Sequence, residues 1–139
     1  MKPVPFSNKN IRSEDIKIVN KILKSGWLTH GENANKFEKE FKRFTKSKYA
    51  VTVSSCTAGL HLACQALGFK KGDEIIVPAI THIATAHAVS YCGASPIIAD
   101  INLYEGSINL DDLKKKINKR TKGIIVVHMA GFPNDMTEI

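Results

Sequence analysis

A run of small residues holds the clearest potential for chemistry in this chain. It has the sequence SSCTAG at positions 54–59 and leads into a segment with helical periodicity. The first turn of a helix leaves N–H groups unpaired and carries the positive end of the helix dipole, so such a turn can hold an anion such as a phosphate. Serine and threonine also cap helices that bind nothing, so the run alone leaves both interpretations open.

The flanking residues predict the two elements that position this turn. Residues 49–53 are β-branched and aromatic and predict a buried strand. Residues 57–67 predict a helix, with one face formed by Leu60, Ala63, Cys64 and Leu67. The predicted turn therefore lies where a strand runs directly into a helix.

The rest of the chain from residue 46 alternates strands with helices. The sequence predicts strands at 74–78, 96–101 and 123–128, a helix at 81–92 capped by Thr81, a loop at 102–110 and a helix at 111–119. Uninterrupted apolar strands between helices indicate an α/β fold with a mostly parallel sheet flanked by helices. Ligands of such sheets bind beyond the carboxyl ends of the strands, so we expect the 54–59 turn and His82 to share one rim.

The N-terminal part predicts two amphipathic helices after an extended lead-in at 1–10. The first has Ser13 as its cap, ends at Gly26 and buries Ile16, Val19, Ile22 and Leu23; the second covers 33–44 and buries Phe37, Phe41 and Phe44. Between them lies the loop GWLTHG at 26–31, which carries the only tryptophan. Trp27 either packs over the core or lines a ligand cleft, and the sequence alone favours neither.

Composition excludes several classes of protein. With 139 residues, 43% hydrophobic and 24% charged, the chain is typical of a globular domain, and it has no apolar run long enough to cross a membrane, so we expect a cytoplasmic protein. The net charge of +7 comes from lysines spread over several helices without interleaved aromatic residues, which favours a solvated surface over nucleic-acid binding.

The titratable and sulfur side chains form no recognisable catalytic or metal-binding set. Cys56, Cys64 and Cys92 are odd in number, lack a CxxC pair and lie among small or apolar residues, so we expect reduced thiols in the core and no metal site. No carboxylate pair or Ser-His-Asp arrangement follows from the spacing. An imidazole beside a helix start, such as His82, usually has no special role.

Four blocks of sequence nevertheless resemble the opening part of one enzyme family. In chain order they are SGWLTHGENANKFEKEF, YAVTVSSCTAGLHLA, GDEIIVPAITHIATAHAVSYCGASPIIADI and INLDDLKKKINKRTKGIIVVHMAGFPNDM. Together they resemble the DegT/DnrJ/StrS family of sugar aminotransferases, which depend on pyridoxal 5'-phosphate (PLP). The blocks cover nearly the whole chain, in the family's order and spacing.

The resemblance implies the N-terminal part of the large domain of a type I PLP-dependent aminotransferase, working as a homodimer. It assigns the cofactor phosphate to the backbone N–H groups of Cys56, Thr57 and Ala58 and to the Thr57 hydroxyl. It places His82 flat on the pyridine ring, where most relatives carry an aromatic residue. More loosely, it assigns the sugar-nucleotide cleft to the loop residues Trp27, Thr29, His30 and Gly31.

The resemblance also implies which parts of the site this chain lacks. In the family, the Schiff-base lysine and the acid that pairs with the pyridine nitrogen follow the block that ends here at Met136, so we assign no catalytic residue. Residues 1–45 would form a helical lead-in with the substrate-cleft loop, and 46–139 an incomplete PLP-binding domain that is inactive alone.

The implied reaction transfers an amino group from an amino acid, expected to be glutamate, to a keto-sugar nucleotide for surface polysaccharide or amino-sugar biosynthesis. Two alternatives stay open at this point. One is a dehydratase or deoxygenase of the same family, in which histidine replaces the lysine. The other is a non-catalytic fragment or binding module.

Overall fold

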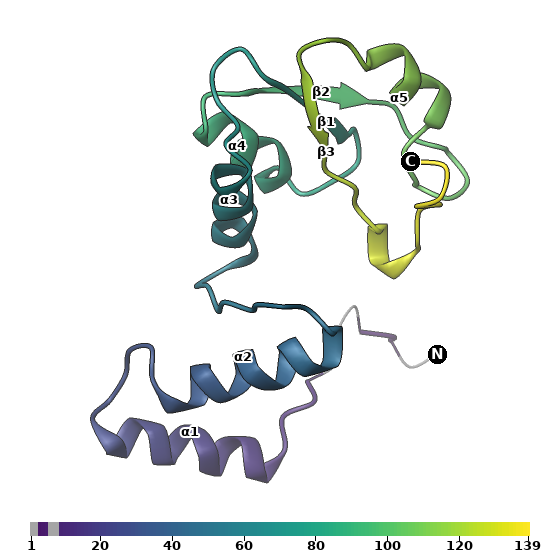
Figure 1. The fold of residues 1–139 in the computed structure, drawn as a ribbon. Coiled ribbons are helices and arrows are strands. Elements are labelled where there is room, and N and C mark those ends of the chain that lie inside the picture. Colours follow the sequence, from purple (N-terminus) through teal and green to yellow (C-terminus); the bar gives the residue numbers. More distant parts are fainter. Residues whose placement is uncertain (1–2, 6–8) are drawn as a thin grey trace. The chain divides into compact units, whose positions relative to one another are not determined.

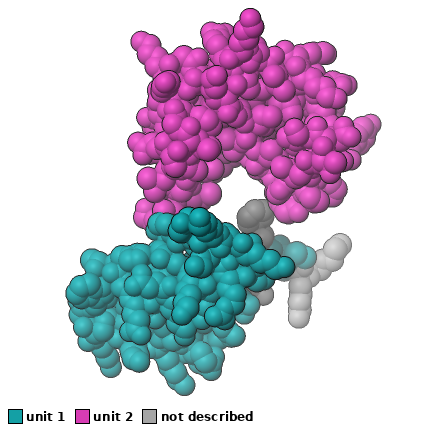
Figure 2. All heavy atoms as spheres, viewed as in Figure 1, with its two compact units in different colours: residues 1–52 teal, residues 53–139 magenta. Residues whose placement is uncertain are grey.

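The structure is a computed structural model that describes residues 3–5 and 9–139. The chain forms two compact units, residues 1–52 and residues 53–139, coloured separately in Figure 2. The predicted lead-in at 1–10 lies partly outside the described residues, and its described part has no regular structure. The assignment of separate roles to 1–45 and 46–139 stays a prediction.

Unit 1 contains two helices, α1 (Ser13–Ser25) and α2 (Glu32–Thr45) (Figure 1). The prediction of Ser13 as the cap of α1 is wrong. Arg12 is the cap, because its N–H donates to the Asp15 carboxylate at 2.9 Å while the Ser13 hydroxyl donates to Glu14. Gly26 ends α1 as predicted, with a left-handed φ of 74° that suits glycine.

The apolar faces predicted for these helices are not buried. Neither α1 nor α2 has a buried residue, and the side chains of Val19, Phe37 and Phe44 are 54%, 58% and 85% exposed. The apolar residues do recur at helical spacing, and the ring centroids of Phe37 and Phe41 lie 5.8 Å apart. Two helices alone have too little surface in common to enclose a core, so the prediction of a buried face was wrong.

Unit 2 is built on a three-stranded parallel sheet with the order β2-β1-β3. The strands are β1 (Glu74–Pro78), β2 (Ser95–Ala99) and β3 (Thr121–Ile124), and every residue of the central strand β1 is buried. The unit's helices are α3 (Cys56–Ala66), α4 (Ala84–Tyr91) and α5 (Leu110–Lys116) (Figure 1). None of the described helices is long and apolar enough to span a bilayer.

Helices cover both faces of this sheet, because successive residues of β1 point in opposite directions. Ile75 and Val77 pack against α3 and α4 in one apolar cluster, together with the buried Cys64. Ile76 packs on the other face with Leu113 of α5. The predicted α/β fold with a parallel, helix-flanked sheet is confirmed.

The strand predicted at 49–53 is absent. Tyr49 and Val51 are 74% and 76% exposed, and the three strands of the sheet pair only with one another. A β-branched segment needs a neighbouring strand to pair with, and the Thr52 N–H donates to the Glu38 side chain instead. Residues 51–53 therefore approach the start of α3 as an irregular segment.

The strand predicted at 123–128 is displaced toward the N-terminus. The Ile125 N–H still donates to the Ile76 carbonyl at 2.9 Å. The backbone groups of residues two apart on a strand point to the same neighbouring strand, so Pro78 is the next residue of β1 after Ile76 whose backbone points to β3. Proline has no N–H to donate. The hydrogen-bond ladder between β1 and β3 ends there, and the short 3-10 helix η1 (Met129–Gly131) comes later in the chain.

The remaining boundaries differ for local reasons. The helix predicted at 81–92 begins at Ala84, because the Thr81 hydroxyl is hydrogen-bonded to the Thr85 hydroxyl and does not cap the helix. The helix predicted at 111–119 ends at Lys116, since Ile117 turns to an extended conformation.

All three cysteines are free, but only Cys64 is buried, whereas Cys92 is half-buried and Cys56 is exposed. The predicted core position is therefore wrong for Cys56, which begins helix α3. Burial raises the pKa of the Cys64 thiol.

Candidate cofactor turn and substrate loop

The 54–59 turn caps helix α3 through its second serine. Ser55 has an extended backbone, and its Oγ accepts a hydrogen bond from the Ala58 N–H at 3.1 Å. Its carbonyl accepts from the Gly59 N–H at 3.0 Å. The N–H groups of Cys56 and Thr57 have no acceptor among the described residues. Of the three N–H groups assigned to a phosphate, two are therefore open, and that of Ala58 is held by the cap.

These features fit an anionic ligand. Two open N–H groups and the Thr57 hydroxyl lie at the N-terminus of α3, an 11-residue helix, where the helix dipole favours negative charge. The turn carries no acidic side chain that would oppose a phosphate. Phosphate binding by Cys56, Thr57 and Ala58 stays a prediction with a compatible donor set.

His82 lies in the turn that follows β1. Its Nδ1 accepts a hydrogen bond from the N–H of Ala84, the first residue of helix α4, at 3.1 Å. The N-cap residue of α4 is Ile83, so the predicted cap at Thr81 is wrong. The residue is exposed. The ring is thus held at one nitrogen and open to contact, which is compatible with the predicted stacking on an aromatic cofactor and does not test it.

The four residues assigned to the substrate loop lie together in unit 1. Trp27, Thr29, His30 and Gly31 all line a cavity of about 1010 Å³ between the loop, α1 and the first turn of α2. The indole Nε1 donates to the His30 carbonyl at 3.2 Å. A Cβ added to Gly31 would lie 2.7 Å from the indole, so the ring packs where only glycine leaves room.

Sequence reasoning missed the residue that organises this region, Glu38. Its Oε1 accepts from the backbone N–H of Thr52 at 2.7 Å and from the Thr52 hydroxyl at 2.8 Å, and lies 3.8 Å from His30 Nε2. These contacts lower the pKa of the Glu38 carboxyl, with the backbone hydrogen bond from Thr52 as the main cause. Nothing in the sequence singles it out, because a glutamate on a lysine-rich helix is typical of a solvated face.

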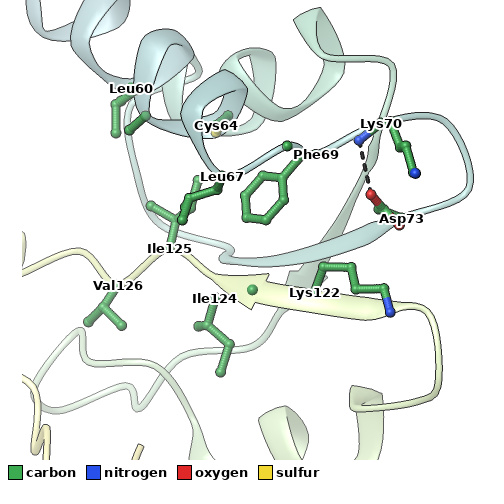
Figure 3. A pocket seen from close by; sticks show the side chains of 13 residues that line it. Leu60, Cys64, Leu67, Phe69, Lys70, Asp73, Lys122, Ile124, Ile125 and Val126 are labelled. Atoms are coloured by element: carbon green, nitrogen blue, oxygen red, sulfur yellow. Dashed lines mark hydrogen bonds between the residues drawn. The ribbon is translucent and has the colours of Figure 1, made fainter.

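A second cavity, of about 620 Å³, lies in unit 2 between α3 and β3. Figure 3 shows its mostly apolar lining, with Leu60, Leu67, Phe69 and Ile124 among the labelled side chains. It is bordered by a free edge of the sheet, since β3 pairs with β1 alone. None of the predicted site residues lines it.

Comparison with known proteins decides the family. The model of the DegT/DnrJ/EryC1/StrS aminotransferase family matches residues 9–139. The chain belongs to this family. GDP-perosamine synthase of Vibrio cholerae is 38% identical over 137 residues, which cover 98% of this chain and 37% of that protein. The chain thus spans less than two fifths of this relative's length.

Solved structures agree with the family assignment. One is the sugar aminotransferase Spr1654 from Streptococcus pneumoniae in its PLP form. The match covers 97% of this chain and 34% of the Spr1654 chain, with a TM-score of 0.91 and 34% identity. GDP-4-keto-6-deoxymannose-3-dehydratase with a trapped PLP-glutamate geminal diamine is also similar. The match covers 98% of this chain and 37% of the dehydratase chain, with a TM-score of 0.90 and 32% identity. PLP is the cofactor of these DegT-family neighbours, and the resemblance found in the sequence is confirmed.

Proposed function

We propose that this chain supplies the phosphate-binding turn and the ring-stacking histidine of a PLP site in a sugar-nucleotide aminotransferase. The complete protein would transfer an amino group from an amino acid, expected to be glutamate, to a keto-sugar nucleotide. The observation that carries the proposal is the start of α3, where the N–H groups of Cys56 and Thr57 are open within a family whose cofactor carries a phosphate. The likeness to GDP-perosamine synthase supports a GDP-linked sugar as the substrate.

The proposed cofactor-binding residues of this chain have separate tasks. The N–H groups of Cys56 and Thr57, with the Thr57 hydroxyl, bind the phosphate dianion at the positive end of the helix dipole. His82, held through Nδ1 by the α4 backbone, covers one face of the pyridine ring. When bound, PLP serves as an electron sink for the carbon that carries the amino group.

The substrate side of the proposal rests on unit 1. Trp27 is 65% exposed, and the hydrogen bond from its indole Nε1 to the His30 carbonyl orients the ring. The indole therefore offers an aromatic face to a base or sugar ring. Thr29 and His30 add polar groups to the same cavity. The Schiff-base lysine, the acid at the pyridine nitrogen, a homodimeric assembly and a cytoplasmic location are further parts of the proposal.

Absorbance spectroscopy tests it directly. PLP is added to residues 1–139 and to the complete protein, and each is treated with borohydride and then dialysed. We expect the complete protein to show a shifted cofactor band and to retain the cofactor after reduction, whereas the 139-residue chain retains none. A Thr57→Val substitution in the complete protein should weaken PLP binding by about tenfold, the effect of one hydrogen bond to a charged group. Unchanged affinity in that variant would contradict the assignment of the turn.

A dehydratase of the same family is the second candidate. The similarity to GDP-4-keto-6-deoxymannose-3-dehydratase supports it, with a TM-score of 0.90 over 98% of this chain. In that case the complete protein would bind PLP without a bond that borohydride reduces. Incubation with a GDP-keto-sugar and glutamate, followed by mass spectrometry, separates an aminated product from a deoxygenated one.

A further inference from the structure

Asn134 is a buried polar residue that joins three segments of unit 2. It is 6% exposed, its Oδ1 accepts from the Ile108 N–H at 2.9 Å, and its Nδ2 donates to the Val127 carbonyl at 2.8 Å. A backbone N–H can only donate and a carbonyl can only accept, so these two bonds fix which end of the amide is oxygen. The Nδ2 group can therefore only donate in any further contact that it makes.

His128 lies against this amide. Its Nδ1 is 3.1 Å from the Asn134 backbone N–H, which donates to it, and 3.2 Å from Asn134 Nδ2. Both neighbours are donors, so Nδ1 must hold a lone pair and the proton of the neutral ring must be on Nε2. His128 is exposed, and its Nε2 has no partner among the described residues.

The backbone after β3 is shaped to hold this contact. His128 follows the carboxyl end of β3, and the chain then reverses through Ala130 and Gly131, with φ values of 51° and 85°. The reversal returns Asn134 to the imidazole. An alanine in a left-handed conformation costs of order 1 kcal/mol, so the fold sustains strain to keep this arrangement.

We propose that His128 is a ligand-binding residue, a neutral imidazole fixed as the Nε2–H tautomer that donates to an anionic oxygen at the carboxyl edge of the sheet. The inference rests on the proposed function, because the carboxyl ends of parallel strands are where α/β folds bind ligands. The oxygen acceptor belongs to a phosphate, phenolate or carboxylate of the cofactor or of the substrate. In this tautomer Nδ1 accepts from Asn134, and the Nε2–H is the ring's remaining donor.

Two substitutions in the complete protein separate a binding role from a structural one. His128→Asn places an amide oxygen near the position of Nδ1, so it keeps the acceptor for Asn134 and removes the outer donor. His128→Gln carries an amide N–H to the position of Nε2 and removes the acceptor. We expect the asparagine variant to keep the wild-type Tm and to raise the PLP Kd or the KM of the substrate about tenfold or more.

The glutamine variant should show the opposite pattern, with a lower Tm and an affinity close to that of wild type. A rise in the PLP Kd identifies the cofactor as the source of the oxygen, and a rise in KM alone identifies the substrate. Wild-type affinity for both in the asparagine variant would overturn the inference.

The tautomer has its own readout, which does not depend on activity. Nitrogen-15 NMR of histidine-labelled complete protein without ligand should show His128 with a protonated Nε2 and a bare Nδ1 at neutral pH, and a protonated Nδ1 would overturn the inference. If wild type binds no PLP, the proposed function fails and the ligand part of this inference fails with it, whereas the NMR result still decides the tautomer.

Discussion

Glu38 and Thr52 are joined by two hydrogen bonds that converge on one carboxylate oxygen, at 2.7 Å from the Thr52 backbone nitrogen and 2.8 Å from its hydroxyl. The bonds tie helix α2 to the segment that precedes the 54–59 turn. Because Thr52 donates its backbone N–H here, the charged form of Glu38 is stabilised and its pKa is lowered.

A Glu38→Gln substitution should make unfolding less dependent on pH in the acid range. A carboxyl whose pKa is lower in the folded state stabilises the fold above its unfolded pKa and loses that contribution as the pH falls through the folded value. We expect the variant to be less stable than wild type at pH 7 and the difference to shrink below the ordinary glutamate value of 4.5. Urea unfolding at pH 7 and pH 3 measures it.

Glu40→Gln is the matched control, because Glu40 lies on the same helix and makes no hydrogen bond or ion pair with the described residues. It should follow wild type at both pH values. If both variants give the same pH dependence, the bond between Glu38 and Thr52 does not explain the lowered pKa.

Two predicted strands, at 74–78 and at 49–53, show where the sequence predicted the fold correctly and where it did not. Strand β1 was predicted with its observed bounds, because a buried central strand has an apolar run ended by proline. The strand at 49–53 has a similar composition and failed, since no neighbouring strand pairs with it and Glu38 binds the Thr52 N–H. Local patterns report what a segment favours, whereas a strand also requires a partner.

The candidate site divides in the same way. The 54–59 turn was predictable because a cap and the helix it begins are local in sequence, and the structure places Ser55 as that cap. The hydrogen bond that His82 accepts from Ala84 depends on ring orientation, and the contact between His128 and Asn134 also depends on a reversal of the backbone. Residue types do not encode either feature. The sequence therefore located the turn and missed the geometry of both histidines.

Replacing Lys46 with glycine should stabilise unit 1. Lys46 ends α2 with a left-handed φ of 55°, a conformation that glycine adopts without steric cost. After allowing for the greater freedom of glycine in the unfolded chain, we expect a gain of about 0.5–1 kcal/mol in the free energy of unfolding. Lys39→Gly, inside the same helix, should instead cost about 1 kcal/mol, and a loss at both positions would contradict the expected role of Lys46.

Gly123 and Gly59 should respond oppositely to alanine. A Cβ on Gly123 in β3 would lie 2.9 Å from the ring of Phe69, which Figure 3 shows beside this strand, so Gly123→Ala should cost about 1–3 kcal/mol through overpacking. A Cβ on Gly59 in α3 meets only Val53, at an ordinary 3.4 Å. Gly59→Ala should therefore stabilise by about 0.5–1 kcal/mol, and thermal unfolding of both variants compares them.

Gly31→Ala should disturb the proposed substrate loop at 26–31 without unfolding the protein. The new methyl group would meet the indole of Trp27 at 2.7 Å, so the ring must leave its position and its bond to the His30 carbonyl. Because Trp27 is the only tryptophan of residues 1–139, the fluorescence of this 139-residue chain reports the displacement. We expect a shifted emission maximum and an almost unchanged Tm for this chain. In the complete protein we expect a KM for the sugar nucleotide that rises about tenfold while the Kd for PLP stays constant.

Ala34→Gly provides the control for Gly31→Ala, since Ala34 lines the same cavity from α2 and its substitution removes a methyl group instead of adding one. It should weaken the helix by roughly 0.5–1 kcal/mol and leave the tryptophan emission unchanged. A normal KM in the Gly31→Ala variant, despite a displaced indole, would separate Trp27 from substrate binding. The cavity would then be part of the packing of unit 1, because a loop that positions substrate cannot lose its aromatic face without a loss of affinity.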